Sequence, residues 1–174
     1  MLQKFLSRTR DQLSENILKS IGNSNFVEEA MLYSALGNSK MIRASLVIAS
    51  GKINEDVADE SLLSLATAIE LMHTYSLIHD DLPSMDDDDL RRGQDSNHIK
   101  FGEANAILAG DALQTLAYEV ICDEKSIEPK YRIEAIKMIS NACGKNGMVY
   151  GQYLDINTEK EKINKKLIED IHNL

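Results

Sequence analysis

A stripe of side chains that ends at Asp80 constrains the fold more than any other feature of the sequence. Its members recur at the i, i+3, i+4, i+7 spacing of one helix face: Leu62, Ala66, Ile69, His73, Ser76 and Asp80. The stripe begins apolar and ends at a carboxylate. It therefore predicts a long helix that starts in the core near residue 61 and ends at the mouth of a cavity. No segment shows the alternating pattern of a strand, so we expect an all-α fold.

Helical spacing also covers most of the remaining chain. A second helix is expected behind a cap at Asn25, ending near residue 36. Further helices are predicted over residues 2–21, 40–50, 103–121, 129–144, 147–157 and 163–174. The segment before the long helix is expected to start at Asn54 or Asp56. At 174 residues the length is that of a single domain, residues 1–174. The last pattern stops without a cap, so we expect the N-terminal portion of a larger all-α domain.

Residues 80–89 hold six aspartates and no basic residue. Such a cluster repels itself unless a cation enters it. Carboxylate oxygens without cysteine suit a hard ion such as Mg²⁺, which usually binds together with a phosphate group. Arg91 and Arg92 follow directly, and guanidinium groups bind phosphate oxygens in pairs. The alternative is a solvated acidic loop.

Charge and composition exclude several classes of function. Six of the nine net negative charges lie in residues 80–89, so the acidity is local and we expect no nucleic-acid partner. Cys122 and Cys143 fit no zinc or redox spacing, which favours a reducing, cytoplasmic setting. No apolar run approaches 18 residues and no secretory signal is visible, so no membrane span is expected.

Taken with its flanks, the acidic stretch resembles the trans-isoprenyl diphosphate synthases, and among them the bacterial farnesyl diphosphate synthase branch. The resemblance rests on three stretches, His73 to Gly93, Lys100 to Leu113 and Gly151 to Asp155. It implies an isoprenoid synthase type bundle of helices around a central cavity, with C-terminal helices missing from the present chain. It also implies a Mg²⁺-dependent prenyltransferase that joins isopentenyl diphosphate to an allylic diphosphate, dimethylallyl or geranyl, and it implies a homodimer with residues 103–121 near the interface.

The resemblance assigns a role to each candidate residue. Asp80 and Asp86 would hold Mg²⁺, Asp81 would support them, and Arg91 would grip the allylic diphosphate. Isopentenyl diphosphate would be held by Lys40, Arg43, His73 and Arg92. Read without the resemblance, Lys40 and Arg43 are an exposed helix start and His73 is a core histidine.

Two further pairs are candidates. Tyr75 and Ser76 lie about one turn before Asp80, where an aromatic ring would limit a growing prenyl chain to the C15 product. The alternative is that Tyr75 only packs in the core. Gln152 and Asp155 either face the cavity or tie helices together.

The chain departs from the family pattern in two places. The usual Gly-Gly-Lys-Arg-x-Arg-Pro block has its counterpart here in residues 38–44, where Lys40 and Arg43 keep their places while Met41 and Ala44 replace arginine and proline. The family's second aspartate-rich motif is absent, so we expect no activity from these 174 residues alone.

Three alternatives stay open: a geranylgeranyl diphosphate synthase, an inactive fragment or non-catalytic partner of such an enzyme, and a class I terpene cyclase. The sequence disfavours a calcium-binding module. An EF-hand counted from Asp86 fails, because its fifth and sixth positions are Leu90 and Arg91.

Overall fold

The computed structural model describes residues 2–53, 57–158 and 165–172. The described chain forms two compact units, residues 1–128 and 129–174. The first unit contains these elements in order: α1 (Leu2–Ile21), α2 (Phe26–Ala35), α3 (Ile42–Gly51), α4 (Asp59–Asp80), β1 (Leu90–Arg91), β2 (Gln94–Asp95), α5 (Asn97–Phe101) and α6 (Glu103–Asp123). The second contains α7 (Pro129–Cys143), α8 (Met148–Thr158) and α9 (Lys165–His172). The all-α prediction is confirmed, since the strands of the described chain are two of two residues each.

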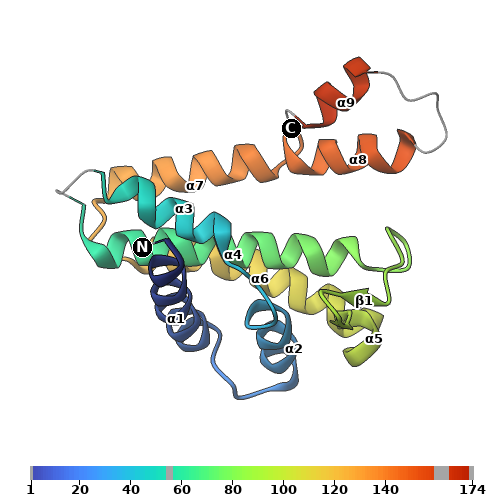
Figure 1. The fold of residues 1–174 in the computed structure, drawn as a ribbon, viewed down its shortest axis with the longest axis horizontal. Helices are drawn as coiled ribbons and strands as arrows, with labels where there is room; N and C mark the ends of the chain where they lie inside the picture. The colour runs from blue at the N-terminus through green and yellow to red at the C-terminus, as the bar shows by residue number, and fades with distance from the viewer. Residues whose placement is uncertain (1, 54–56, 159–164, 173–174) are drawn as a thin grey trace. The chain divides into compact units, whose positions relative to one another are not determined.

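Helix α4 is the centre of the first unit, and α6 runs alongside it (Figure 1). Small side chains allow the close approach: Ala66 and Ala68 of α4 and Ala106 and Ala109 of α6 are fully buried. Helices α1, α2 and α3 also pack on α4. The predicted stripe holds, because its first members, Leu62 and Ala66, are buried while its last members are partly exposed. Buried side chains continue along α4 as far as Ile78, so the core surrounds most of this helix and only its C-terminal end reaches the surface.

Several boundaries follow from local chemistry. Asn25 caps α2, as predicted, because its side-chain oxygen accepts from the amides of Val27 and Glu28 at 3.0 Å each. Helix α3 begins at Ile42, two residues later than expected, because Met41 takes a left-handed conformation (φ 47°). The expected start at Asn54 or Asp56 lies outside the described residues.

Residues 95–97 end a hairpin and start α5. In that hairpin Leu90 pairs with Asp95 and Arg91 with Gln94. The two residues between the strands, Arg92 (φ 55°) and Gly93 (φ 80°), both have positive φ, as the tight turns of two-residue hairpins require. Arg92 therefore projects from the tip of the hairpin.

By length and composition alone, α4 could cross a membrane, but 67% of its most apolar window is buried within the protein. The apolar character of α4 is thus used in packing against its neighbours. The single-domain interpretation of residues 1–174 and the absence of a membrane span stay predictions.

Candidate active site

The C-terminal end of α4 and the turn after it bring the acidic residues together. The helix ends at Asp80, and the chain folds back so that the Asp86 amide donates to the Asp80 carbonyl at 2.9 Å. The Asp88 amide likewise donates to the Asp81 carbonyl at 3.2 Å. Pro83 lies in this turn, where a proline cannot continue the helix. Asp80 and Asp86 therefore lie at the two ends of one turn.

The residues of this turn suit Mg²⁺ in their chemistry. The atoms that could bind a metal ion here are carboxylate and carbonyl oxygens. The Asp86 side chain is exposed to solvent, where a metal ion could reach it. No group of three or more His, Cys, Asp or Glu side chains preset to hold a metal occurs among the described residues. Mg²⁺ needs no such cage, because it is usually bound by one or two carboxylates together with substrate phosphates. Asp80 and Asp86 have the oxygen chemistry that Mg²⁺ prefers, and their pairing as its ligands stays a prediction.

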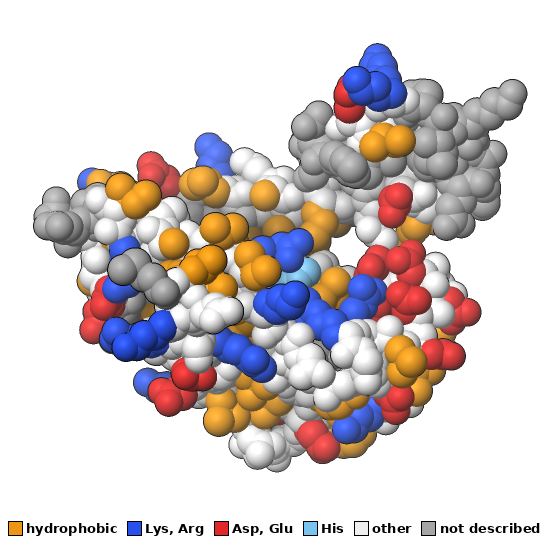
Figure 2. Space-filling model, in the orientation of Figure 1, with side chains coloured by type: hydrophobic (Ala, Val, Ile, Leu, Met, Phe, Trp, Pro, Cys, Tyr) orange, Lys and Arg blue, Asp and Glu red, His pale blue; other side chains and the backbone are white. Residues whose placement is uncertain are grey.

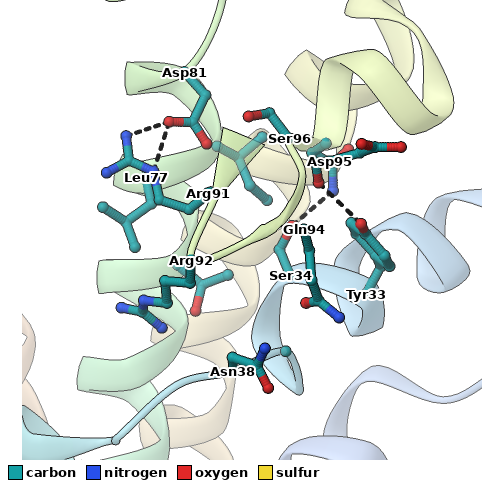
Figure 3. Close-up of a pocket in the computed structure, with 14 residues that line it drawn as sticks. Tyr33, Ser34, Asn38, Leu77, Asp81, Arg91, Arg92, Gln94, Asp95 and Ser96 are labelled. Carbon is teal, nitrogen blue, oxygen red and sulfur yellow. Dashed lines mark hydrogen bonds and ion pairs between the residues drawn. The ribbon is translucent and has the colours of Figure 1, made fainter. Parts of the chain in front are cut away.

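Arg91 lies within the acidic cluster and is bonded to it. Its Nε donates to Asp81 Oδ1 at 2.7 Å, and its Nη2 also bonds this carboxylate. Nη2 lies 3.4 Å from Asp80 Oδ2 and 3.6 Å from Asp88 Oδ2. The hydrogen bond to Asp81 is the largest cause that raises the pKa of Arg91 above its ordinary value. Only 4% of the Asp81 side chain is exposed, against 23% for Asp80, so Asp81 serves here as the anchor of Arg91 (Figure 3).

A basic cluster of Arg43, His73 and Arg92 lies beside the acidic turn. Arg43 Nη1 is 3.1 Å from His73 Nε2. The pKa of His73 is lowered to about 4, first by burial and then by the positive charges of Arg43, Arg92 and Arg91. The imidazole is therefore neutral at pH 7, and Nε2 accepts a hydrogen bond from Arg43 while the proton sits on Nδ1. Figure 2 shows basic side chains around a histidine, next to a group of acidic side chains.

Lys40 lies in the loop before α3, with an exposed side chain. Lys40 precedes Arg43 by three residues, and its part in the site stays a prediction. The arrangement joins two features suited to diphosphate: a carboxylate pair for a metal and a set of fixed cations.

A small cavity of about 40 Å³ lies between the hairpin, the end of α2 and α4. Its lining includes Asp81, Arg91 and Arg92, with Gln94 and Asn97 from the hairpin side (Figure 3). Asn97 Nδ2 donates to the Ala30 carbonyl and to Ser34 Oγ at 2.8 Å each. The Tyr33 hydroxyl donates to the Asp95 carbonyl at 2.9 Å. These bonds dock the hairpin, and thus both arginines, onto α2.

Sequence reasoning missed the docking residues Tyr33 and Asn97. Their partners lie 62 to 67 residues away in the chain, and no local pattern signals such bonds. An Arg-Gly turn between two short strands is also weaker evidence of a hairpin than Asn-Gly.

Tyr75 is almost fully buried, at 6% exposure, and its ring is T-shaped to the His79 ring, with the two centroids 5.7 Å apart. The neighbouring Ser76 is half-buried, and its hydroxyl donates to the His73 carbonyl at 2.9 Å. Gln152 and Asp155 lie on α8 in the second unit. Their part in a shared cavity stays a prediction, as does the deep cavity itself.

The family model and the sequence relatives that match this chain describe the same class of protein. The family model described as polyprenyl synthetase matches residues 24–173. A farnesyl diphosphate synthase from Escherichia coli (strain K12) is 48% identical over 173 residues, which cover 98% of this chain and 58% of the relative. The chain thus spans somewhat more than half the length of that relative.

Solved structures resemble the whole described fold. An FPP/GFPP synthase from Zymomonas mobilis superimposes with a TM-score of 0.94 at 37% identity, covering 99% of this chain and 64% of the other. A geranyltransferase from Legionella pneumophila gives a TM-score of 0.90 at 37% identity, covering 99% and 61%.

Proposed function

The chain belongs to the polyprenyl synthetase family, and we propose that it forms the metal- and diphosphate-binding part of a farnesyl diphosphate synthase. The reaction would condense dimethylallyl or geranyl diphosphate with isopentenyl diphosphate. The observation that carries this proposal is the placing of two complementary clusters side by side. One is the carboxylate pair Asp80 and Asp86, and the other is the basic cluster around His73.

The acidic turn would bind the allylic diphosphate. Asp80 and Asp86 would hold Mg²⁺ there, and the ion would neutralise charge that develops on the leaving diphosphate. The Asp86 carboxylate is exposed while the backbone of the turn is fixed by bonds from Asp86 and Asp88. The ligands are thus held in place before the substrate arrives, which lowers the reorganisation needed during ionisation.

Arg91 is already oriented toward this place. Two of its guanidinium nitrogens are bonded to the buried Asp81, and the third, Nη1, is left for other partners. A guanidinium held in this way can donate to a diphosphate oxygen with little further loss of side-chain entropy. Asp81 would then act on the substrate through Arg91, and its support of the metal would be indirect.

The basic cluster would hold isopentenyl diphosphate through Lys40, Arg43 and Arg92. His73 is neutral, so it contributes as a hydrogen-bonding partner of Arg43 and as a donor through Nδ1. Its neutrality avoids adding a further charge to a crowded cationic site, where like charges oppose one another. This second diphosphate site distinguishes a condensing prenyltransferase from a class I terpene cyclase, which binds one diphosphate substrate.

We place the product at C15 because Tyr75 lies below the metal-binding end of α4 as a large, buried ring. The second candidate function is a synthase of longer products such as geranylgeranyl diphosphate. One observation favours it: the solved neighbour from Zymomonas mobilis is described as an FPP/GFPP synthase, so chains of this fold are described with more than one product length.

Assembly and location are part of the same proposal. Helix α6 exposes Ile107 at 43% and Leu108 at 52%, and exposed apolar side chains on one helix suit a contact with a second copy. We therefore keep the homodimer with residues 103–121 near its interface. A cytoplasmic setting agrees with the free cysteines Cys122 and Cys143.

The experiment is a turnover assay of the complete gene product with isopentenyl and geranyl diphosphates across a Mg²⁺ titration. Asp80→Asn should cut kcat by about a hundredfold or more, as removal of a group that stabilises transition-state charge does. The matched control is Asp89→Asn, an exposed aspartate of the same turn, with turnover within about threefold of wild type, since an exposed substitution costs about 0.5 kcal/mol or less. Equal losses in both variants would contradict the assigned ligands, and no condensation by the wild type would contradict the function.

A further inference from the structure

The loop that carries Lys40 is held in an unusual backbone conformation. Met41, the residue before α3, has φ 47° and ψ 40°. Residues with a Cβ seldom adopt this left-handed region, so a non-glycine residue stays there only when its surroundings hold it. Met41 is 2% exposed. The conformation of this one residue sets the direction in which Lys40 leaves the loop and in which α3, with Arg43, begins.

A chain of two hydrogen bonds holds Met41 in place. The Met41 amide donates to Ser39 Oγ at 3.2 Å, and Ser39 Oγ donates to Glu70 Oε1 at 2.8 Å. Ser39 is 5% exposed and Glu70 2%. Ser39 thus links the loop to the side of α4, one turn before His73.

Burial of the Glu70 carboxyl group costs folding free energy, which a residue with a purely packing role would not need to cost. The second oxygen of Glu70, Oε2, is buried without a hydrogen-bond partner among the described residues. A buried carboxyl costs free energy unless its oxygens are satisfied, whereas an apolar side chain of similar size carries no such cost. The contact that a leucine could not reproduce is the one with Ser39.

The Ser39 hydroxyl is a feature of this chain's own sequence. In the Gly-Gly-Lys-Arg-x-Arg-Pro pattern, the residue before the lysine is glycine, which has no hydroxyl. This chain also has Ala44 where the pattern has proline, and proline restricts the backbone before it. The hydrogen bond to Ser39 restrains the backbone at Met41, three residues before the position at which the pattern has proline.

We propose that Ser39 and Glu70 are positioning residues for the binding of isopentenyl diphosphate, because together they fix the Met41 turn and hence the directions of Lys40 and Arg43. The inference rests on the proposed function of Lys40 and Arg43. Neither Ser39 nor Glu70 touches the substrate in this account. Their effect is on the affinity of one substrate, with the chemistry at the acidic turn left intact.

The test is a calorimetric titration of the complete gene product with isopentenyl diphosphate, and separately with a non-ionisable thio analogue of dimethylallyl diphosphate in the presence of Mg²⁺. Ser39→Ala should weaken isopentenyl diphosphate binding about tenfold, as the loss of a buried hydrogen bond does. Glu70→Leu should have a similar effect, while Glu70→Gln, which keeps an acceptor oxygen, should stay within about threefold of wild type. Binding of the allylic analogue should be unchanged in all three.

The matched control is Ser50→Ala at the far end of α3, where the hydroxyl donates to the nearby Val47 carbonyl at 3.0 Å. Thermal unfolding of each variant separates stability from binding. The positioning role is wrong if the Ser39→Ala variant binds isopentenyl diphosphate as tightly as the Ser50→Ala variant does. It is also wrong if Ser39→Ala weakens the binding of isopentenyl diphosphate and of the allylic analogue equally. If the wild type does not bind isopentenyl diphosphate at all, the proposed function itself fails.

Discussion

Removal of the Arg91 side-chain charge should lower the free energy of unfolding, because Arg91 is the counter-ion of the buried Asp81 carboxylate. Arg91 bonds Asp81 through two nitrogens, and the Asp81 side chain is 4% exposed. Arg91→Gln would leave that carboxylate buried without its counter-ion. Breaking a fully buried pair costs about 3–5 kcal/mol. Because 31% of the arginine side chain is exposed, we expect a smaller loss of about 2–3 kcal/mol in the free energy of unfolding.

A double-mutant cycle isolates this pair. Asp81→Asn removes the negative charge but keeps the shape, so Arg91→Gln in that background should cost only about 1 kcal/mol or less. The coupling energy should then be about 1–2 kcal/mol, near the lower end of the range for hydrogen bonds to charged groups. The assay is urea unfolding in chelator-treated buffer, followed by circular dichroism.

The control for this cycle is Arg10→Gln, an exposed arginine of α1, which should change stability by less than about 0.5 kcal/mol. The reasoning is refuted if the effects of Arg91→Gln and Asp81→Asn are additive within about 0.5 kcal/mol. Such a result would mean that the Arg91–Asp81 contact contributes nothing beyond the separate side chains.

Three further predictions follow from single contacts. A Cβ at position 110 would lie 2.2 Å from His79 Nε2, so Gly110→Ala should destabilise the wild type by about 1–3 kcal/mol through overpacking. In a His79→Ala background the same change should stabilise the protein by up to about 1 kcal/mol, because alanine has the higher helix propensity. Urea unfolding measures both effects, and stabilisation in both backgrounds would rule out a clash between the Cβ at position 110 and His79. The pKa of His73 is lowered to about 4, so its contribution to stability is complete above pH 6.5 and is lost as the pH falls toward 4. After discounting for its partial exposure, the loss is about 1–2 kcal/mol, and a His73→Gln variant should show a flatter pH profile of unfolding; an identical profile would contradict the assignment. Tyr75→Ala should shift the product from C15 toward C20 or longer, and an active variant that still releases only C15 would show that the ring does not limit the prenyl chain.

The long helices could be predicted from the sequence because their signals are local. The stripe from Leu62 to Asp80 and the cap at Asn25 depend on spacing and on one side chain, and both were found where expected. The turn at Pro83 follows from proline geometry. In each case the physical cause lies within a few residues of its effect.

The contacts inside the candidate site could not be predicted, because they are bonds between residues that lie far apart in the sequence. The pairing of Arg91 with Asp81 was not predicted, because the two residues lie ten positions apart on either side of the acidic turn. The link from Ser39 to Glu70 spans 31 residues. The family resemblance singled out both Asp81 and Arg91, but in separate roles, Asp81 as a support of the metal-binding pair and Arg91 as a ligand of the allylic diphosphate. Their mutual contact arises from the fold of the acidic turn, which no spacing rule describes.

The late start of α3 has a similar cause. Helical spacing from residue 40 predicted a helix there, yet the described backbone turns left-handed at Met41. The competing influence is the buried Ser39–Glu70 contact, which lies outside the local pattern.

The central claim is that the acidic turn and the basic cluster bind two different diphosphates for one condensation. The most direct measurement is chromatography of the products formed by the complete gene product from labelled isopentenyl diphosphate, geranyl diphosphate and Mg²⁺. The account predicts label in a C15 diphosphate, with none formed when Mg²⁺ is removed by chelation. Unreacted isopentenyl diphosphate beside a hydrocarbon derived from geranyl diphosphate alone would contradict it, because that outcome requires only one diphosphate site.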